Sequence, residues 1–509
     1  MTFTTTTIMR DAEPPRKPVI RTVARNTAFM LGGQILIKVF AFMFNIYVVR
    51  RLGDAHFGRY ATALAYVAIF AMFTDLGTSS LAVREMARKE EHIAWMVPNI
   101  IALRALLSLI AIAGITGSAW LLGKTPEMVF GILIASCGLL LYAFQGPLDG
   151  VMIAQERLDF SSAFSLLNQM VFITLGTAAL VMGAGYTGLL LASLGGVLAM
   201  ALASAYVVRR VLRLHFQRPN LHYWPSLLRA SLPFGIAGAT HEFARRFDTV
   251  FMSFVLTDAA VGWYNVPYNL IVMMLLMAQS MAISIYPTLV KEYDSGRGSI
   301  QDTVQRALRY LLIISLPIAM GGMLLADRII ILLYGQEFAS AIPVMRILVW
   351  ALPAMFLAEI LGRTSSTMHL EKKAARIAVV NALISVTLNV ILISTLGVLG
   401  AAIAMVTSRL MDVVLTSVII GPAMLWKRNT GPLFRVIAAG AFMGAIVWLL
   451  RDVHFLNAVD ARVWLLLVIG AGAVVYGVAA LLLGAVRPGE VQYIYSAVRY
   501  RLRRPRRHE

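Results

Sequence analysis

The long apolar segments of this chain constrain its fold more than any other feature. A helix needs about 20 mostly apolar residues to cross a bilayer. Hydrophobic residues make up 59% of the 509 and charged residues only 14%, whereas a soluble globular chain has about 45–50% and about 25%. We therefore expect an all-α polytopic membrane protein with little room for a soluble domain. The fourteen predicted spans are 27–49, 58–80, 98–123, 128–154, 162–184, 187–208, 227–256, 259–289, 307–333, 341–367, 376–396, 400–426, 433–450 and 462–484.

A weak internal repeat groups these spans. Gly58 and Tyr60 recur as Gly262 and Tyr264 at an offset of 204 residues, and "GAGYTG" and "GVLG" each join two spans late in a half. Six spans per half is an even number, so both halves enter the membrane in the same direction, as a parallel repeat. The predicted organisation is a disordered cytoplasmic tail (1–24), a six-helix lobe (25–208), a cytoplasmic linker with an interfacial segment (209–226), a second six-helix lobe (227–426), an extra helix pair (427–484) and a basic cytoplasmic tail (485–509).

The basic residues predict the orientation. With the N-terminus inside, most of the 45 Lys and Arg fall in inside segments. The outside loops and the span ends next to them carry only Arg50, Arg51, Arg59, Lys124, Arg451 and Arg462. Positive charge is retained on the cytoplasmic side of membrane proteins. We therefore expect a multi-pass protein of the cytoplasmic (inner) membrane with both termini in the cytoplasm. The net charge of +19 is then a topology signal that also favours contact with anionic lipid, and no nucleic-acid partner is expected.

No motif supports enzyme chemistry. Gly183, Gly185 and Gly188 match a dinucleotide fingerprint in letters, but that motif needs a strand before it, and here both neighbours are spans. His241-Glu242 opens a zinc-protease pattern, but Arg245 stands where the second histidine belongs. The single cysteine, Cys137, permits no disulfide within the chain. We expect no catalytic residue, no metal and no cofactor.

The seventh span carries five ionisable residues in eight positions. A charge at the bilayer centre costs about 2.5–3.5 kcal/mol, so intramembrane charges usually face a bundle interior or a water-filled cavity. At about 100° per residue, His241, Arg245 and Asp248 lie opposite a phenylalanine face. Arg245 is therefore expected to bind substrate, and His241 and Asp248 are candidate ion-coupling residues.

Other spans supply further candidates. Gln34, Lys38 and Asn45 share a stripe of the first span, Arg104 lies in the third without a local partner, and Asn265 and Asn269 lie four apart in the eighth. The expected cavity cations are Lys38, Arg104 and Arg245, with Gln34, Asn45, Asn265 and Asn269 as polar lining. The residues expected to form structural ion pairs on their own helices are Glu242 with Arg246, Glu359 with Arg363, and Arg409 with Asp412.

The chain resembles the O-antigen type polysaccharide flippases of the multidrug/oligosaccharidyl-lipid/polysaccharide exporter superfamily. The matching words are "FGRYATA" (57–63), "DLG" (75–77), "VRE" (83–85), "VGWY" (261–264), "LYGQEF" (333–338) and "LNVILISTLGVLGAA" (388–402). The resemblance implies ion-coupled alternating access that moves a polyprenyl-pyrophosphate-linked oligosaccharide between leaflets. It also implies a glycan polymerase and glycosyltransferases of the same pathway as candidate partners. Asp75, in "DLG", is a third candidate coupling residue, although the word can equally shape the end of the second span.

Three other functions stay open at this point. A drug or metabolite exporter of the same superfamily is the nearest, although a cavity for cationic drugs calls for carboxylates. A glycan polymerase or ligase needs room outside the membrane, and the longest outside loop, 451–461, is about eleven residues. A membrane scaffold would need no inward polar stripes.

Overall fold

A computed structural model describes residues 17–213, 216–295, 300–426, 430–451 and 461–485 of the chain. Regular structure in these residues is helical throughout, with no strand, which confirms the predicted all-α class. Side chains are described from residue 37 onward, with short gaps that include 236–241. The predicted tails lie largely outside the described residues, except that the first helix begins at Lys17, before the expected boundary at residue 25.

The helices form two successive groups and a final pair. The N-terminal group is α1 (Lys17–Asp75), α2 (Thr78–Arg88), α3 (His92–Leu121), α4 (Pro126–Ala154), α5 (Leu158–Val181) and α6 (Gly185–Tyr206). The C-terminal group is α7 (Trp224–Val255), α8 (Asp258–Ser295), α9 (Ile300–Leu324), α10 (Ala326–Tyr334), α11 (Ala341–Leu348), α12 (Ala351–Thr367), α13 (Glu371–Leu396), α14 (Val398–Ile420) and α15 (Pro422–Trp426). The final pair is α16 (Thr430–Arg451) and α17 (Ala461–Leu482).

Twelve helices of the described chain are long and apolar enough to cross a membrane. The count differs from the predicted fourteen because α1 contains two predicted spans and α7 is not among the twelve. The two halves of α1 meet at Gly53, whose φ of 73° and ψ of 177° are not helical. Glycine adopts positive φ without the steric cost that a Cβ imposes, so the chain bends there without a separate loop.

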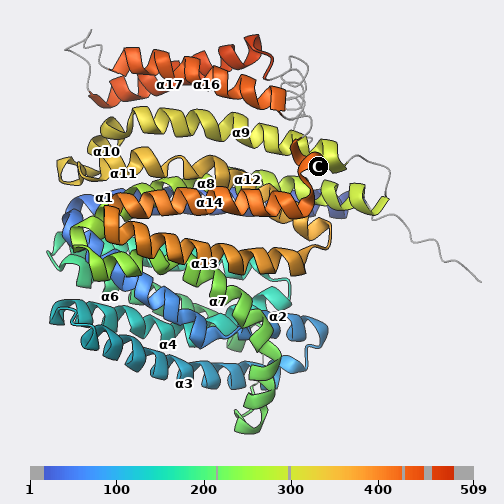
Figure 1. Ribbon diagram of the computed structural model, residues 1–509. Helices are drawn as coiled ribbons and strands as arrows, with labels where there is room; N and C mark the ends of the chain where they lie inside the picture. Colours follow the sequence, from blue (N-terminus) through green and yellow to red (C-terminus); the bar gives the residue numbers. More distant parts are fainter. Residues whose placement is uncertain (1–16, 214–215, 296–299, 427–429, 452–460, 486–509) are drawn as a thin grey trace, which may run out of the picture.

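The helices lie side by side, with α16 and α17 stacked beyond α9 (Figure 1). Packing continues between the two groups, because α1 contacts α4 in its own group and both α7 and α8 in the other. One hydrophobic core joins residues of both groups, including Phe44 and Phe57 of α1 and Val266 of α8. The α1–α7–α8 contact is therefore the place where the two groups meet.

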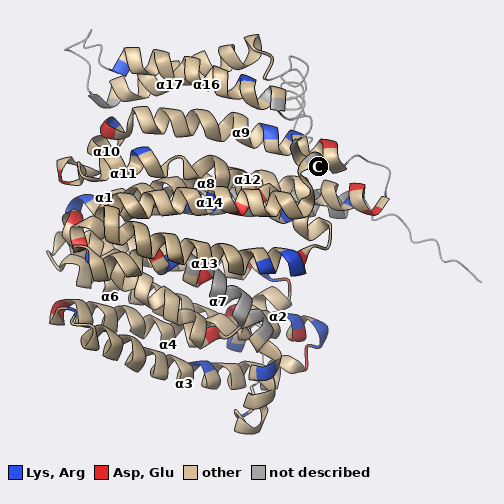
Figure 2. Cartoon of the chain, viewed as in Figure 1, with Lys and Arg blue, Asp and Glu red and all other residues tan. Residues whose placement is uncertain are grey.

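Charged residues gather at the two ends of the bundle, and the middle of most helices is free of them (Figure 2). We call the end that holds the α1 bend the Gly53 end, and the end where α1 finishes the Asp75 end. The linker after α6 lies at the Asp75 end against the start of α3. There the backbone N–H of Gln217 donates to the Ala94 carbonyl at 2.9 Å, and that of Asn220 donates to Asn99 Oδ1 at 2.8 Å.

Candidate functional site

The charged stretch of α7 is organised around one carboxylate. Arg245 donates two hydrogen bonds to Glu242, from Nε at 2.9 Å and from Nη2 at 2.6 Å. Arg246 reaches the same carboxylate with Nε at 3.4 Å. The exposed side-chain fractions are 36% for Arg245 and 26% for both Glu242 and Arg246, so the three groups are half-buried. We call these three residues the Glu242 cluster.

This arrangement changes the expected pairing. The sequence predicted that Arg246 would pair with Glu242 while Arg245 stayed available, and the pair with Arg246 is present. Arg245, however, makes the shorter, two-pronged contact, and such bidentate bonds are the stronger kind. The phenylalanine face forms as predicted, with Phe243 and Phe247 ring centroids 5.3 Å apart.

Asp248 is bound by neighbours other than arginine. It is 6% exposed, and its Oδ2 accepts from the Tyr264 hydroxyl of α8 at 2.5 Å. Its Oδ1 accepts from the Thr249 backbone N–H at 2.6 Å and from the Thr249 hydroxyl at 3.3 Å. Arg245 is therefore held by Glu242 in this structure, and Asp248 has separate partners.

The remaining polar candidates have varied surroundings. Lys38 is exposed, and within the described part of the structure its ammonium has no hydrogen bond or ion pair. Asn45 and Asn269 are half-buried, whereas Asn265 is buried and donates to the Val261 carbonyl of its own helix at 2.9 Å. The side chains of Gln34 and His241 lie outside the described residues.

Arg104 has a partner that its local sequence does not show. Its Nη2 lies 3.1 Å from Asp75 Oδ1, and its Nη1 donates to the Ser79 hydroxyl at 3.1 Å. Asp75 also accepts from the Ser79 backbone N–H at 3.1 Å and so satisfies a free N–H at the start of α2. The "DLG" word thus forms a helix junction tied to α3.

Of the two other predicted same-helix pairs, the one between Glu359 and Arg363 is replaced by other contacts. In the described chain no ion pair joins Glu359 to Arg363, because Glu359 accepts from Gln279 Nε2 at 3.4 Å and Arg363 lies 5.6 Å from the Tyr286 ring centroid. The Arg409–Asp412 pair stays a prediction. At Glu359 and Arg363, contacts to another helix replace the pair that was expected along one helix.

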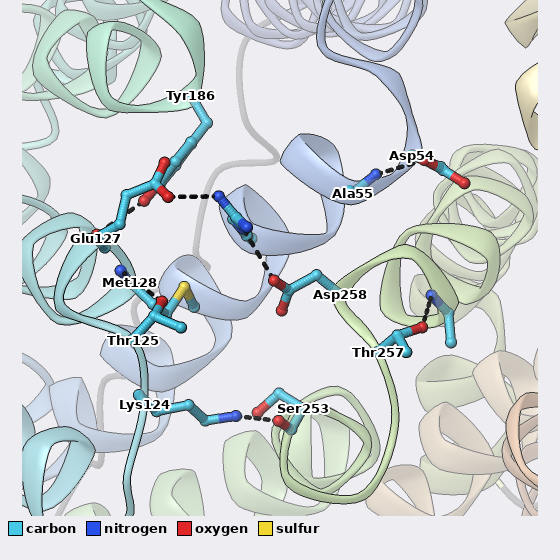
Figure 3. Close-up of polar contacts among 12 residues, drawn as sticks. Asp54, Ala55, Lys124, Thr125, Glu127, Met128, Tyr186, Ser253, Thr257 and Asp258 are labelled. Carbon is cyan, nitrogen blue, oxygen red and sulfur yellow. Dashed lines mark hydrogen bonds and ion pairs between the residues drawn. The ribbon is translucent and has the colours of Figure 1, made fainter.

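Sequence reasoning missed a polar network at the Gly53 end. Arg59 of α1 bridges Glu127 Oε2 of α4 at 2.7 Å and Asp258 Oδ2 of α8 at 2.9 Å. Figure 3 shows Glu127, Tyr186 and Asp258 close together, with Lys124 facing Ser253 nearby. Burial lowers the pKa of the Lys124 ammonium, and the charge of Asp258 offsets part of that shift. The sequence holds one sign of this network, because Asp54 and Asp258 are 204 residues apart and so occupy equivalent positions of the repeat.

A bundle with twelve helices long and apolar enough to cross a membrane, in the described part of the chain, is that of a multi-pass membrane protein. The chain belongs to the polysaccharide biosynthesis protein family, whose model matches residues 23–292. Two relatives from Haloferax volcanii are 21% identical, the probable low-salt glycan biosynthesis flippase Agl15 over 77% of this chain and 82% of its own length, and the probable flippase AglR over 93% and 98%. The predicted family resemblance is confirmed.

The fold is also that of a solved flippase. The lipid II flippase MurJ in an inward closed conformation superposes with a TM-score of 0.70 and 15% identity, covering 88% of this chain and 98% of MurJ. At that identity the similarity concerns the fold.

Proposed function

We propose that this protein is a flippase that moves a polyprenyl-pyrophosphate-linked oligosaccharide across the cytoplasmic membrane by alternating access. Family membership and the flippase relatives support the class of cargo. The observation that carries the proposal is the charge balance of the Glu242 cluster, in which one carboxylate serves two guanidinium groups. The nearby Asp248 carboxylate is held by Tyr264 and Thr249 instead, so within the cluster the guanidinium groups exceed the carboxylate by one, which suits an anionic ligand.

The geometry suggests how the ligand head is bound. A pyrophosphate offers several anionic oxygens, and arginine binds such oxygens with two parallel N–H bonds. The ligand can therefore take the place of Glu242 on Arg245 or Arg246, and Glu242 takes the arginine back when the ligand leaves. Lys38, exposed on α1 and 204 residues before Glu242, supplies a cation from the N-terminal group. Arg104 is the weakest of the three proposed cavity cations because it is held by Asp75.

Asp248 is the best placed residue for ion coupling in this proposal. It is a buried carboxylate with only neutral donors within hydrogen-bond distance in the described structure. The repeat places Phe44 at the corresponding position of the N-terminal group, so the carboxylate is not required by the shared architecture. Protonation or cation binding at Asp248 would change its bond with Tyr264 and hence the α7–α8 contact. His241 and Asp75 stay secondary candidates.

The proposed topology places the Gly53 end outside and both termini in the cytoplasm. The Asp75 end then carries the linker and the exposed basic start of α13, in agreement with the retention of basic residues inside. A glycan polymerase and glycosyltransferases of the same pathway are proposed partners. The glycosyltransferases build the lipid-linked unit that the flippase receives, and the polymerase uses the unit that it delivers.

The test measures movement of a fluorescent polyprenyl-pyrophosphate oligosaccharide across proteoliposome membranes, normalised to the amount of inserted protein. We expect Arg245→Ala and Arg246→Ala each to lower the rate at least roughly ten-fold, as the loss of one charge-assisted bond implies, and Arg245→Lys to retain part of it. Arg157→Ala is the matched control, because Arg157 pairs with Asp159 at the surface. Full activity of the Arg245→Ala/Arg246→Ala double variant would show that the Glu242 cluster is structural.

The rival drug exporter makes a different demand on the same residues. A cationic drug requires a free carboxylate, and Glu242 is engaged by two arginines. Glu242→Gln is therefore expected to leave glycan-lipid binding intact, whereas a drug exporter would lose its binding of a lipophilic cation.

A further inference from the structure

Two similar seven-residue words lie at the Gly53 end of the bundle. Residues 54–60 read "DAHFGRY" and residues 258–264 read "DAAVGWY", so Asp, Ala, Gly and Tyr recur at one spacing and an offset of 204. The first copy follows the bend of α1, and the second begins α8. Each copy therefore starts the second span of its group.

The two copies pack against each other reciprocally. A Cβ added to Gly58 would lie 1.7 Å from the Asp258 carbonyl oxygen, and one added to Gly262 would lie 2.4 Å from the Asp54 carbonyl oxygen. Real Cβ atoms do not approach so closely. Each glycine thus admits the backbone of the other copy, and the pairing follows the two-fold relation of the repeat.

The side chains repeat the same reciprocity. Arg59 Nε donates to Asp258 at 2.9 Å, and the residue at the equivalent position, Trp263, donates its Nε1–H to Asp54 at 2.9 Å. Each copy therefore offers one donor and one carboxylate to the other. Glu127 holds Arg59 from the opposite side at 2.7 Å, which fixes the guanidinium toward the C-terminal group.

Two further contacts flank the pair and join the same two helix groups. The Lys124 ammonium, just before α4, donates to the Ser253 carbonyl of α7 and lies 4.8 Å from the Phe254 ring centroid. Arg50 Nε donates to the Leu333 carbonyl of α10 at 2.6 Å. All donors here are side chains that can release their acceptors without unfolding a helix.

We propose that the two words form a latch that holds the Gly53 end closed between the helix groups and opens during the transport cycle. The proposal rests on the proposed function, which requires that end to open. Arg59, Asp258 and Glu127 are 25%, 36% and 53% exposed, and partly exposed ion pairs are individually weak. Weak, solvent-accessible bonds over a glycine contact suit a closure that forms and breaks in every cycle.

The first experiment reads closure without any substrate. A reporter Ala260→Cys, which is 6% exposed, is placed in a Cys137→Ser background, and its reaction rate with an impermeant maleimide is measured in nanodiscs. Gly58→Ala and, separately, Asp258→Asn should each raise the rate roughly five-fold, which corresponds to about 1 kcal/mol on the closed state. Gly117→Ala is the matched control, because a Cβ there meets nothing within 4 Å. Unchanged rates in both latch variants, with normal elution of the folded protein, would overturn the proposal.

The second experiment locks the latch. Asp54→Cys and Trp263→Cys, joined by a short reducible crosslinker, should stop movement of the fluorescent glycan lipid, and reduction should restore it. Undiminished movement in the crosslinked protein would show that this end need not open. If the unmodified protein moves no glycan lipid, the proposed function fails, while the maleimide rates still decide whether the latch closes this end.

Discussion

Arg104 of α3 lies 3.1 Å from Asp75 at the end of α1, and this ion pair joins three successive helices. The same carboxylate accepts from the hydroxyls of Thr78 and Ser79 in the first turn of α2, at 3.2 and 2.8 Å. Gly146 of α4 lets the guanidinium pass, since a Cβ there would lie 2.8 Å from Arg104 Nη1. Asp75 thus ends α1, accepts hydrogen bonds from the first turn of α2 and neutralises the charge of Arg104 on α3.

Removing one partner of this pair should be worse than removing both. Asp75→Asn leaves Arg104, which is 7% exposed, without its counter-charge, and an unpaired buried charge costs up to roughly 3–5 kcal/mol. Asp75→Asn/Arg104→Met should recover most of the loss. Thermal melting in detergent and membrane abundance would measure both. A double variant no more stable than Asp75→Asn would mean that Asp75 acts through its bonds to α2 alone.

Loss of the Tyr264–Asp248 hydrogen bond should affect transport more than loss of the hydroxyl of the neighbouring Tyr268. Tyr264→Phe removes a donor from a buried carboxylate, and a hydrogen bond to a charged group contributes about 1.5–3 kcal/mol. Tyr268→Phe serves as the control, because its ring stacks on Tyr264 at 5.8 Å and its hydroxyl has no hydrogen bond in the described structure. We expect only Tyr264→Phe to alter the ion dependence of transport in proteoliposomes. Equal behaviour of the two variants would remove Asp248 from the coupling mechanism.

The sequence predicted the spans well because a bilayer leaves few choices. Backbone groups in lipid must be satisfied within a helix or barrel, so long apolar runs such as 128–154 correspond directly to helices such as α4, Pro126–Ala154. The bend at Gly53 was missed as a bend because a glycine between two spans is equally compatible with a loop.

Side-chain partners were harder to predict for a physical reason. A helical wheel shows which residues share a face but not what lies across from them. Arg104 therefore looked unpartnered although Asp75 is 29 positions before it, and Glu359 and Arg363 looked like a pair although each bonds elsewhere. The Glu242–Arg246 pair was found because both residues lie on one helix turn. The roles assigned to Lys38, Arg245 and the polar lining stay predictions.

Chemical labelling should establish the orientation. Gln336 at the Gly53 end and Lys373 at the Asp75 end are both exposed, so a cysteine at either position should react when reagent reaches that side. With the proposed topology, an impermeant maleimide added to intact cells labels Gln336→Cys, and Lys373→Cys reacts only after permeabilisation. The opposite result would place both termini outside and invert the direction assigned to the latch.

The first turn of α14 should tolerate no side chain at Gly400. A Cβ there would lie 1.9 Å from the Leu392 carbonyl oxygen and 2.3 Å from its carbon, and α13 cannot retreat without losing its packing on α14. Forcing extra atoms into a packed contact costs about 1–3 kcal/mol or more, so Gly400→Ala should markedly lower the yield of folded protein and its melting temperature.

Two other glycines calibrate that effect. Gly188, in the first turn of α6, would place a Cβ 2.4 Å from the Cβ of Ala184. That overlap is smaller than the one at Gly400 and does not involve a backbone carbonyl, so Gly188→Ala should cost less. Gly362 of α12 has nothing within 4 Å of an added Cβ. Gly362→Ala should be neutral or slightly stabilising because alanine favours a helix by up to about 1 kcal/mol. Equal yields of the three variants would show that the close approach at Gly400 does not limit folding.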